Sequence, residues 1–193
     1  MKIAIDIDEV VIEFVESYME FVRSKGYRDV SYESVFSYEL WDILGITKEL
    51  VFELLAEYYE SRYVEKRNLI EGAKVGVEFL RDNHDVVFIT ARPKYMIKET
   101  RDFIFEEFGI LGDRIFFSGD VLGEGRSKDE ICRGLGIGLI IEDSEADSLR
   151  YAKNGLKVLL LDKPWNRNIR HENIVRCFGW DDVLREVRRL DNG

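Results

Sequence analysis

The sequence predicts an α/β protein, with a Rossmann-like core built on a parallel sheet of five strands and a small helical cap inserted after the first strand. Short runs rich in Val, Ile and Phe alternate with segments of helical periodicity, which is the pattern of βαβ units. Runs such as 86–89 and 139–141 are continuously apolar, as expected for interior strands that helices cover on both faces. The strand-like runs are 3–7, 86–90, 115–117, 139–142 and 158–161, and the helical segments between them are 73–82, 94–107, 128–135 and 145–153.

The stretch between the first and second strands breaks this alternation, because no strand-like run occurs there. Residues 11–25 and 48–59 have the apolar spacing of amphipathic helices, and residues 31–41 form an aromatic-rich connection between them. We therefore expect a cap subdomain at 13–69, joined by short hinges to an α/β core made of 1–12 and 70–193.

The later core elements follow from local signals in chain order. Gly72 precedes the helical pattern of 73–82 and marks the return to the core. The second strand ends in the polar residues Thr90-Ala91-Arg92, and the fourth ends in Glu142-Asp143-Ser144. Since the carboxyl ends of parallel strands form one edge of a sheet, these polar residues are expected to face a common crevice.

Composition narrows the class of function. A length of 193 residues, 46% hydrophobic and 34% charged, is enough for one packed core and one modest insertion. The formal net charge of −10 argues against binding to a nucleic-acid polymer or to an anionic membrane. Cys132 and Cys177 lack metal-type spacing and form no disulfide framework, so a reducing compartment, the cytoplasm, is expected. The oligomeric state stays open, with a homodimer among the alternatives.

The first chemical motif is Asp6-Ile7-Asp8-Glu9-Val10, which closes the first strand. Two carboxylates two residues apart can divide the work of a reaction. One stays ionised, attacks phosphorus and binds a cation, while the other moves protons. The structural alternative is a turn or a capping site, which is a common use of such a pair at a strand end.

Three later features add to this motif. The hydroxyl of Thr90 and the amides after it could hold a phosphoryl oxygen, and Lys128 would bring positive charge at a helix start. Asp143, with Glu142 before it, supplies the oxygen ligands that Mg²⁺ prefers. Taken singly, Thr90 and the acidic pair could merely cap helices, and Lys128 could be a surface lysine.

The order of these motifs resembles the haloacid dehalogenase (HAD) superfamily, and the resemblance covers essentially the whole chain. It implies that Asp6 is the nucleophile and a metal ligand, and that Asp8 is the general acid and base and gives a backbone oxygen to the metal. It further implies that Thr90 binds phosphate, Lys128 neutralises the nucleophile and phosphate, and Asp143 completes a Mg²⁺ site. Phosphate-directed members keep an acid at the position of Asp8, which disfavours dehalogenation.

A narrower resemblance is to the 5'(3')-deoxyribonucleotidase branch of that superfamily. The similar segments are 89–93, 141–144 and 162–167, together with the helical insertion. This resemblance adds Ala91 and Arg92 to the phosphate site, although Arg92 could instead pair with a nearby acid. Glu142 stands where that branch often has an aspartate. It is expected to contact the direct metal ligands and not the metal itself.

The aromatic residues of the cap have two possible uses. They could stack on a nucleobase above the crevice, or they could form the core of the small helical cap, which is the commoner use. The residues concerned are Phe14, Tyr18, Phe36, Tyr38 and Trp41.

The sequence thus predicts a magnesium-dependent phosphomonoester hydrolase that forms an aspartyl phosphate, with (deoxy)nucleoside monophosphates as the expected substrates of a 5'-nucleotidase. The alternatives are a phosphatase for sugar phosphates or other small phosphomonoesters, and a catalytically silent nucleotide-binding relative. A receiver-type signalling domain would carry its reactive aspartate after the third strand and would lack the insertion after the first, so it fits less well.

Overall fold

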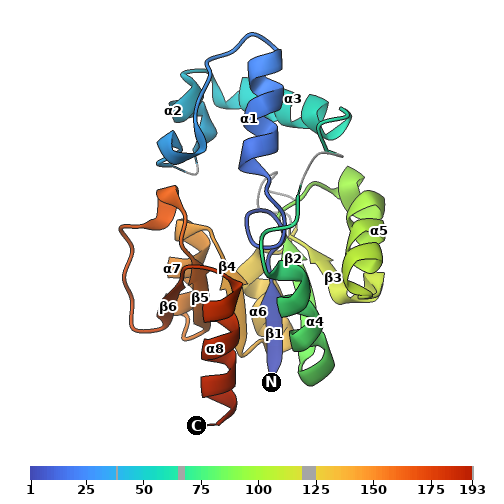
Figure 1. The fold of residues 1–193 in the computed structure, drawn as a ribbon, viewed down its shortest axis with the longest axis vertical. Helices are drawn as coiled ribbons and strands as arrows, with labels where there is room; N and C mark the ends of the chain where they lie inside the picture. Colours follow the sequence, from blue (N-terminus) through green and yellow to red (C-terminus); the bar gives the residue numbers. More distant parts are fainter. Residues whose placement is uncertain (38, 65–67, 119–124, 193) are drawn as a thin grey trace.

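The computed structural model describes residues 1–37, 39–64, 68–118 and 125–192 and shows the expected α/β architecture. Its centre is a parallel sheet of six strands in the order β3-β2-β1-β4-β5-β6 (Figure 1). The first strand lies in the middle of the sheet, paired with β2 on one side and β4 on the other. The strands are β1 (Lys2–Ile5), β2 (Asp85–Thr90), β3 (Ile115–Phe117), β4 (Leu139–Glu142), β5 (Lys157–Leu161) and β6 (Ile174–Cys177).

The sixth strand corrects the predicted count of five. β6 pairs in parallel with β5, from Val158 opposite Ile174 to Leu161 opposite Cys177. It lies at the edge of the sheet, and only Cys177 of its four residues is buried. An edge strand needs no continuous apolar run, and the charged Arg176 in its middle hides the pattern.

Helices cover both faces of the sheet, which explains the continuous apolar strands. On β1, Ile3 and Ile5 pack with one face cluster while Ala4 packs with the other, because successive side chains alternate across a strand. One face is covered by α4 (Ala73–Asn83), α5 (Ile97–Phe108) and α8 (Trp180–Asp191), and the other by α6 (Lys128–Leu135) and α7 (Glu145–Lys153).

The crossing of α4 and α8 also holds the loop that follows β1. A β-carbon on Gly76 of α4 would overlap the indole ring of Trp180, so the two helices meet as closely as they do because position 76 has no side chain. The buried Trp180 then donates its indole N–H to the carbonyl oxygen of Val10 at 3.0 Å. The last helix of the chain therefore fixes the segment that leaves the central strand.

The helices within residues 15–59 lie beyond the carboxyl ends of the strands and make up the helical region (Figure 1). Their apolar side chains form a cluster separate from the two sheet clusters. Trp165 of the core is also part of this helical cluster. The division of the chain at 13 and 69 stays a prediction, and Tyr38 and residues 65–67 lie outside the described residues. The elements are α1 (Val15–Ser24), α2 (Leu40–Leu44), α3 (Lys48–Tyr59) and the 3-10 turn η1 (Tyr32–Ser34).

The two chain segments that connect this helical region to the sheet run side by side. Ile12 bridges to Leu69 in antiparallel fashion, and Glu13 N–H donates to the Asn68 carbonyl at 2.9 Å. Ile70 N–H donates to the Val11 carbonyl at 3.0 Å. Backbone hydrogen bonds therefore join the two connecting segments where the hinges were predicted.

Candidate active site

Four charged groups from three separate segments of the chain meet at the carboxyl edge of the sheet. Asp6 follows β1, Glu142 ends β4 and Asp143 comes directly after it, while Lys128 opens α6. The Lys128 ammonium lies 3.0 Å from Asp6 Oδ1 and 3.4 Å from Glu142 Oε1. All four residues are buried. The structure thus brings together residues that the sequence separates by as many as 137 positions, from Asp6 to Asp143.

The start of α6 determines where Lys128 lies. Ser127 is the N-cap: its hydroxyl accepts from Glu130 N–H at 3.2 Å, and the Glu130 carboxylate accepts from Ser127 N–H at 2.8 Å. This reciprocal capping box fixes the first helical turn, so Lys128 projects from the first helical position. The helix start predicted from the sequence is confirmed.

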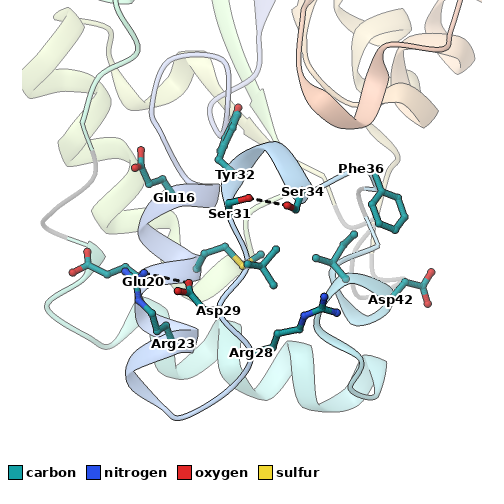
Figure 2. A pocket seen from close by; sticks show the side chains of 13 residues that line it. Glu16, Glu20, Arg23, Arg28, Asp29, Ser31, Tyr32, Ser34, Phe36 and Asp42 are labelled. Atoms are coloured by element: carbon teal, nitrogen blue, oxygen red, sulfur yellow. Dashed lines mark hydrogen bonds and ion pairs between the residues drawn. The ribbon is translucent and has the colours of Figure 1, made fainter.

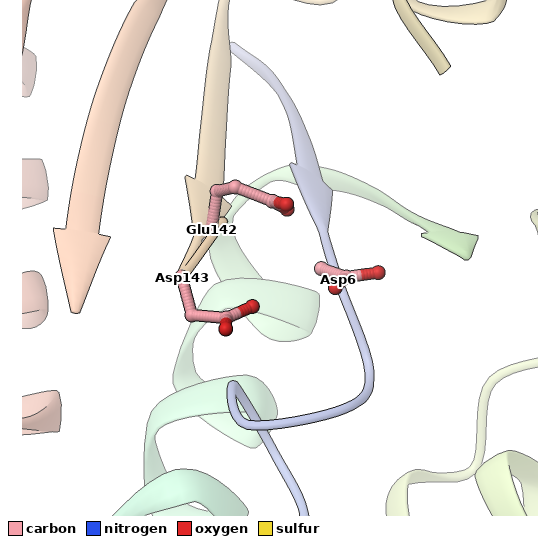
Figure 3. A group of neighbouring side chains, drawn as sticks. All are labelled: Asp6, Glu142 and Asp143. Atoms are coloured by element: carbon pink, nitrogen blue, oxygen red, sulfur yellow. The ribbon is translucent and has the colours of Figure 1, made fainter. Parts of the chain in front are cut away.

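The acidic side chains fit a hard divalent cation. One carboxylate oxygen each from Asp6, Glu142 and Asp143 lies within 4.8 Å of the other two. Figure 3 shows Glu142 and Asp143 extending from the end of β4 toward Asp6. Within the described part of the chain, Glu142 Oε2 and Asp143 Oδ1 are buried and have no hydrogen-bond partner. Buried acceptors without donors are costly, and an all-oxygen set suits Mg²⁺ or Ca²⁺.

Burial and like charge shape the titration of this acidic cluster. Burial raises the pKa of Asp6, and the Lys128 ammonium opposes that rise. Burial and the neighbouring Asp6 carboxylate hold the pKa values of Glu142 and Asp143 well above their usual range. Burial by itself would lower the pKa of Lys128, but the carboxylates of Asp6 and Glu142 raise it well above its ordinary value. A divalent cation would relieve the repulsion that these shifts express.

Residues of the loop after β5 donate hydrogen bonds to Asp143. Within η6 (Pro164–Asn166), the Trp165 indole N–H donates to Asp143 Oδ2 at 3.1 Å. The Asn166 side-chain amide donates to the Asp143 carbonyl and to the Leu161 carbonyl, both at 2.8 Å. The segment 162–167, noted in the sequence only as similar to a family segment, therefore orients an acid of the site.

Asp8 has a different partner from Asp6. The buried Arg92 guanidinium donates to both carboxylate oxygens of Asp8, at 2.9 and 2.8 Å. Burial would lower the pKa of Arg92, but Asp8 raises it. Of the two uses of Arg92 left open by the sequence, pairing with an acid is the one present in this structure.

The remaining phosphate-site residues lie at the end of β2. Thr90 is its last residue and is buried, and its hydroxyl accepts from Arg92 N–H at 3.1 Å. Ala91 lies between them and is half-buried. Because β2 is the immediate neighbour of β1, this segment lies at the same sheet edge as Asp6 and Asp8.

Sequence reasoning missed Glu9, whose carboxylate is buried beside this site. Its backbone lies in the left-handed region, with a φ of 60°. The carboxylate accepts from Phe14 N–H, Val15 N–H, the Tyr32 hydroxyl and the Lys163 ammonium. Burial and Glu9 raise the pKa of Tyr32 far above its ordinary value. Nothing in the local pattern announces this role, because the partners come from three separate segments.

The aromatic residues of the helical region mostly pack against one another. Tyr18 is fully buried and stacks on Phe14, with ring centroids 5.6 Å apart, so its ring is not available to a nucleobase in this structure. Trp41 is half-buried in the same cluster, and Tyr38 lies outside the described residues. Phe36 is 71% exposed and lines a cavity of about 930 Å³ with Tyr32, Ser31 and Ser34 (Figure 2).

Comparisons with known proteins concern the fold and the kind of protein that this chain is similar to. No family profile matches the chain. It is 27% identical over 190 residues to a protein from Clostridium acetobutylicum named as a nucleotidase, spanning 98% of this chain and 95% of that protein. A HAD-like hydrolase from Streptococcus pneumoniae superimposes with a TM-score of 0.69 at 14% identity, covering 96% of this chain and 97% of that one.

A second solved structure is a HAD family hydrolase from Deinococcus radiodurans with bound phosphate and sodium. It superimposes with a TM-score of 0.63 at 14% identity, covering 97% of this chain and 95% of that one. Both likenesses concern the fold. Among the described residues, no helix has the length and apolar character needed to cross a membrane.

Proposed function

We propose that this HAD-superfamily phosphohydrolase is a magnesium-dependent 5'-nucleotidase that hydrolyses (deoxy)nucleoside monophosphates through a phosphorylated Asp6. The observation that carries the proposal is the convergence of Asp6, Lys128 and Asp143 at one sheet edge, with buried acceptors that lack donors. The nucleotide as substrate is supported by the relative named as a nucleotidase.

The metal would be held by Asp6, Asp143 and the backbone carbonyl of Asp8, with Glu142 behind them. The fit rests on the all-oxygen donor set and on the orphaned oxygens of Glu142 and Asp143. When bound, Mg²⁺ supplies positive charge that stabilises the phosphoryl oxygens in the transition state.

The protein's own groups then divide the reaction into two steps. A carboxylate oxygen of Asp6 attacks phosphorus, forming an Asp–O–P bond as the bond from phosphorus to the alcohol oxygen breaks. Asp8 gives its proton to that leaving oxygen, and the resulting carboxylate removes a proton from the water that hydrolyses the aspartyl phosphate. Lys128 neutralises charge on Asp6 and on the transferring group.

The pairing of Asp8 with Arg92 adds one requirement to this scheme. Because Arg92 donates to both oxygens of Asp8, Asp8 must give up at least one of these bonds and take up a proton from solvent on the freed oxygen before it can protonate the leaving oxygen. Arg92 is then free to donate to a phosphoryl oxygen beside Thr90 and the amide of Ala91. The same arginine would thereby serve the free enzyme and the substrate complex in turn.

The test is a panel of nucleoside monophosphates, sugar phosphates and p-nitrophenyl phosphate, assayed with Mg²⁺ and again after chelation. We expect the highest kcat/KM with nucleotides and loss of turnover on chelation. A preference for sugar phosphates would replace the proposed substrate but keep the chemistry. No hydrolysis of any member would favour a silent nucleotide-binding relative.

The nucleophile is tested by Asp6→Asn. We expect turnover to fall on the order of 10⁴-fold or more, because the attacking group is removed while the shape is kept. Asp102→Asn is the matched control, since Asp102 lies on the surface of α5 and pairs with Lys98. Undiminished turnover of the Asp6 variant would refute the role of Asp6.

The cellular location also stays a proposal. Both cysteines are free and buried among the described residues, and burial raises their pKa values to about 12. Unpaired thiols are what a reducing cytoplasm would maintain.

A further inference from the structure

Glu9 combines two unusual features next to the proposed active site. Among the residues that the structure describes, it is the one non-glycine residue with a positive φ. Its side chain is 4% exposed, although carboxylates are rarely buried without partners. Strained backbone persists only where the surroundings hold it, and it is concentrated at functional sites. The contacts of Glu9 therefore need an explanation of their own.

Part of the explanation is local. Glu9 Oε1 accepts from the N–H groups of Phe14 at 2.9 Å and Val15 at 2.7 Å, which are donors at the start of α1. A carboxylate at a helix N-terminus is favourable because it satisfies free donors and the positive end of the helix dipole. This role uses only one oxygen of the carboxylate.

The second oxygen makes contacts that capping does not explain. Glu9 Oε2 accepts from the Tyr32 hydroxyl and from the Lys163 ammonium, each at 2.9 Å. Tyr32 belongs to η1 of the helical region, whereas Lys163 follows β5 of the core. The Lys163 ammonium also lies 5.8 Å from the centroid of the Tyr32 ring. One carboxylate thus joins the segment after the nucleophile to both sides of the boundary between the helical region and the core.

The same turn of the helical region reaches the acidic cluster by a parallel path. The Tyr32 ring packs edge-on against Trp165, with centroids 5.7 Å apart, and Trp165 donates to Asp143. At the rim, the Arg167 guanidinium lies 3.6 Å from the Glu33 carboxylate. The η1 turn is therefore docked on η6, the turn that orients a proposed metal ligand.

We propose that Glu9 is a positioning residue that latches the η1 turn onto the core through Tyr32 and Lys163, and so sets the place of the helical region over the substrate. This inference rests on the proposed function, because the substrate is the phosphomonoester held at Asp6. The latch contributes to substrate binding and takes no part in bond making. Its loss therefore raises KM and leaves kcat nearly unchanged.

The experiment removes contacts of the latch by substituting residues that lie outside the loop of Asp6 and Asp8. Lys163→Met removes the ammonium, and Tyr32→Phe removes one hydroxyl while keeping the ring against Trp165. We expect about a tenfold rise in KM for a nucleoside monophosphate with Lys163→Met, and less than about a twofold change in kcat. Lys163→Arg keeps the charge and should recover most of the lost affinity. Lys153→Met, on the exposed surface of α7, is the matched control.

A double-mutant cycle separates a latch from independent contacts. Glu9→Gln and Lys163→Met together should cost no more than the larger single effect, because both break one ion pair. Additive effects on KM would overturn the latch. A fall in kcat at an unchanged KM would also overturn the latch, since that result would place these residues in the chemical step.

A second readout needs no substrate and so stays informative if the proposed function fails. Amide hydrogen exchange of residues 31–35 should be about tenfold faster in Lys163→Met and in Tyr32→Phe, while the amides of β1 keep their wild-type rates. Wild-type exchange at 31–35 in both variants would refute the latch whatever the enzyme hydrolyses. Failure of wild-type turnover with faster exchange in the variants would refute only the proposed substrate.

Discussion

Two buried groups of charged residues lie at the same edge of the sheet, and they differ in how completely their oxygens are satisfied. The acidic cluster of Asp6, Glu142 and Asp143 faces the Lys128 ammonium, and two of its carboxylate oxygens have no donor among the described residues. The junction around Glu9 has one carboxylate and four donors. Both groups contain a lysine, so composition does not separate them.

The difference indicates what each group is for. A carboxylate with every lone pair engaged holds parts of a structure together, and adding a cation there would displace existing donors. Buried oxygens without donors cost free energy until something binds them. This difference supports the proposal that the acidic cluster binds a ligand, whereas the junction holds the helical region and the core together. Asp8 is intermediate, because both of its oxygens are engaged by Arg92 yet its side chain is 18% exposed.

Among the changes that compare these two groups, the largest effect is expected from removing a proposed metal ligand that has an unsatisfied oxygen. Asp143→Asn should lower kcat/KM on the order of 10³-fold, about 4 kcal/mol, because it removes one charged oxygen ligand of the proposed Mg²⁺. The rise in thermal midpoint that saturating Mg²⁺ gives the wild type should also be lost. Steady-state kinetics and thermal unfolding with and without Mg²⁺ check both results.

The matched control for Asp143→Asn is Asp147→Asn. Asp147 lies on α7 with its carboxylate 3.7 Å from the Lys128 ammonium, and it also pairs with Arg150 at 3.1 Å. It shares the neighbourhood but not the oxygen cluster of Asp6, Glu142 and Asp143. If the Mg²⁺-dependent stabilisation survives in the Asp143 variant and vanishes in the Asp147 variant, the metal ligand is Asp147 and not Asp143.

Two lysine substitutions compare the regions directly. Lys128→Met should lower the free energy of unfolding without metal by about 3 to 5 kcal/mol, because it leaves buried carboxylates without a countercharge. Lys163→Met should cost only about 1 to 2 kcal/mol, because Glu9 keeps three other donors. Chemical denaturation in the presence of a chelator gives both values, and equal losses would contradict the distinction between the two regions.

Mg²⁺ should reduce the difference between these variants. A divalent cation in the acidic cluster can replace part of the charge that Lys128 supplied, so Mg²⁺ should stabilise Lys128→Met at least as much as it stabilises the wild type. It should change the stability difference between Lys163→Met and wild type much less, because Lys163 pairs directly with Glu9 and acts on Asp143 only through space. A similar gain at Lys163 would indicate that Mg²⁺ acts generally on this acidic protein.

The fold was predictable because its signals are local and repeated. Five strands were marked by short apolar runs, and helical periodicity at 128–135 marked α6, whose capping box only the structure shows. The sixth strand was not predicted, because β6 is a half-buried edge strand that contains the charged Arg176. Edge position removes the hydrophobic requirement that made the other strands visible.

The gathering of Asp6, Lys128, Glu142 and Asp143 was also predictable, because each lies at a strand end or a helix start. The general rule for parallel sheets brings such positions to one edge. The pairing of Asp8 with Arg92 was only one of two alternatives, since a sequence does not say which of two anions a guanidinium meets. The functional roles of all these residues remain predictions.

The packing of the helical region and the contacts of Glu9 were the least predictable. The aromatic ring of Tyr18 is equally suited to a core or to a nucleobase, and only the three-dimensional arrangement shows that it is fully buried. Glu9 meets Tyr32 and Lys163 across 23 and 154 positions of the chain. No periodicity or motif encodes such contacts, because they depend on how the helical region is docked.

The smallest expected effect tests the point where the two regions touch. Trp165 donates to Asp143 and packs against Tyr32, so Trp165→Phe removes the hydrogen bond but keeps much of the ring contact. We expect about a tenfold weaker apparent affinity for Mg²⁺, since groups that orient a metal ligand have effects of this size, and little change in kcat at saturating metal. Trp41→Phe, in the helical region, is the control. An unchanged Mg²⁺ dependence of the rate would show that Asp143 holds its orientation without Trp165, and that the junction and the acidic cluster act independently.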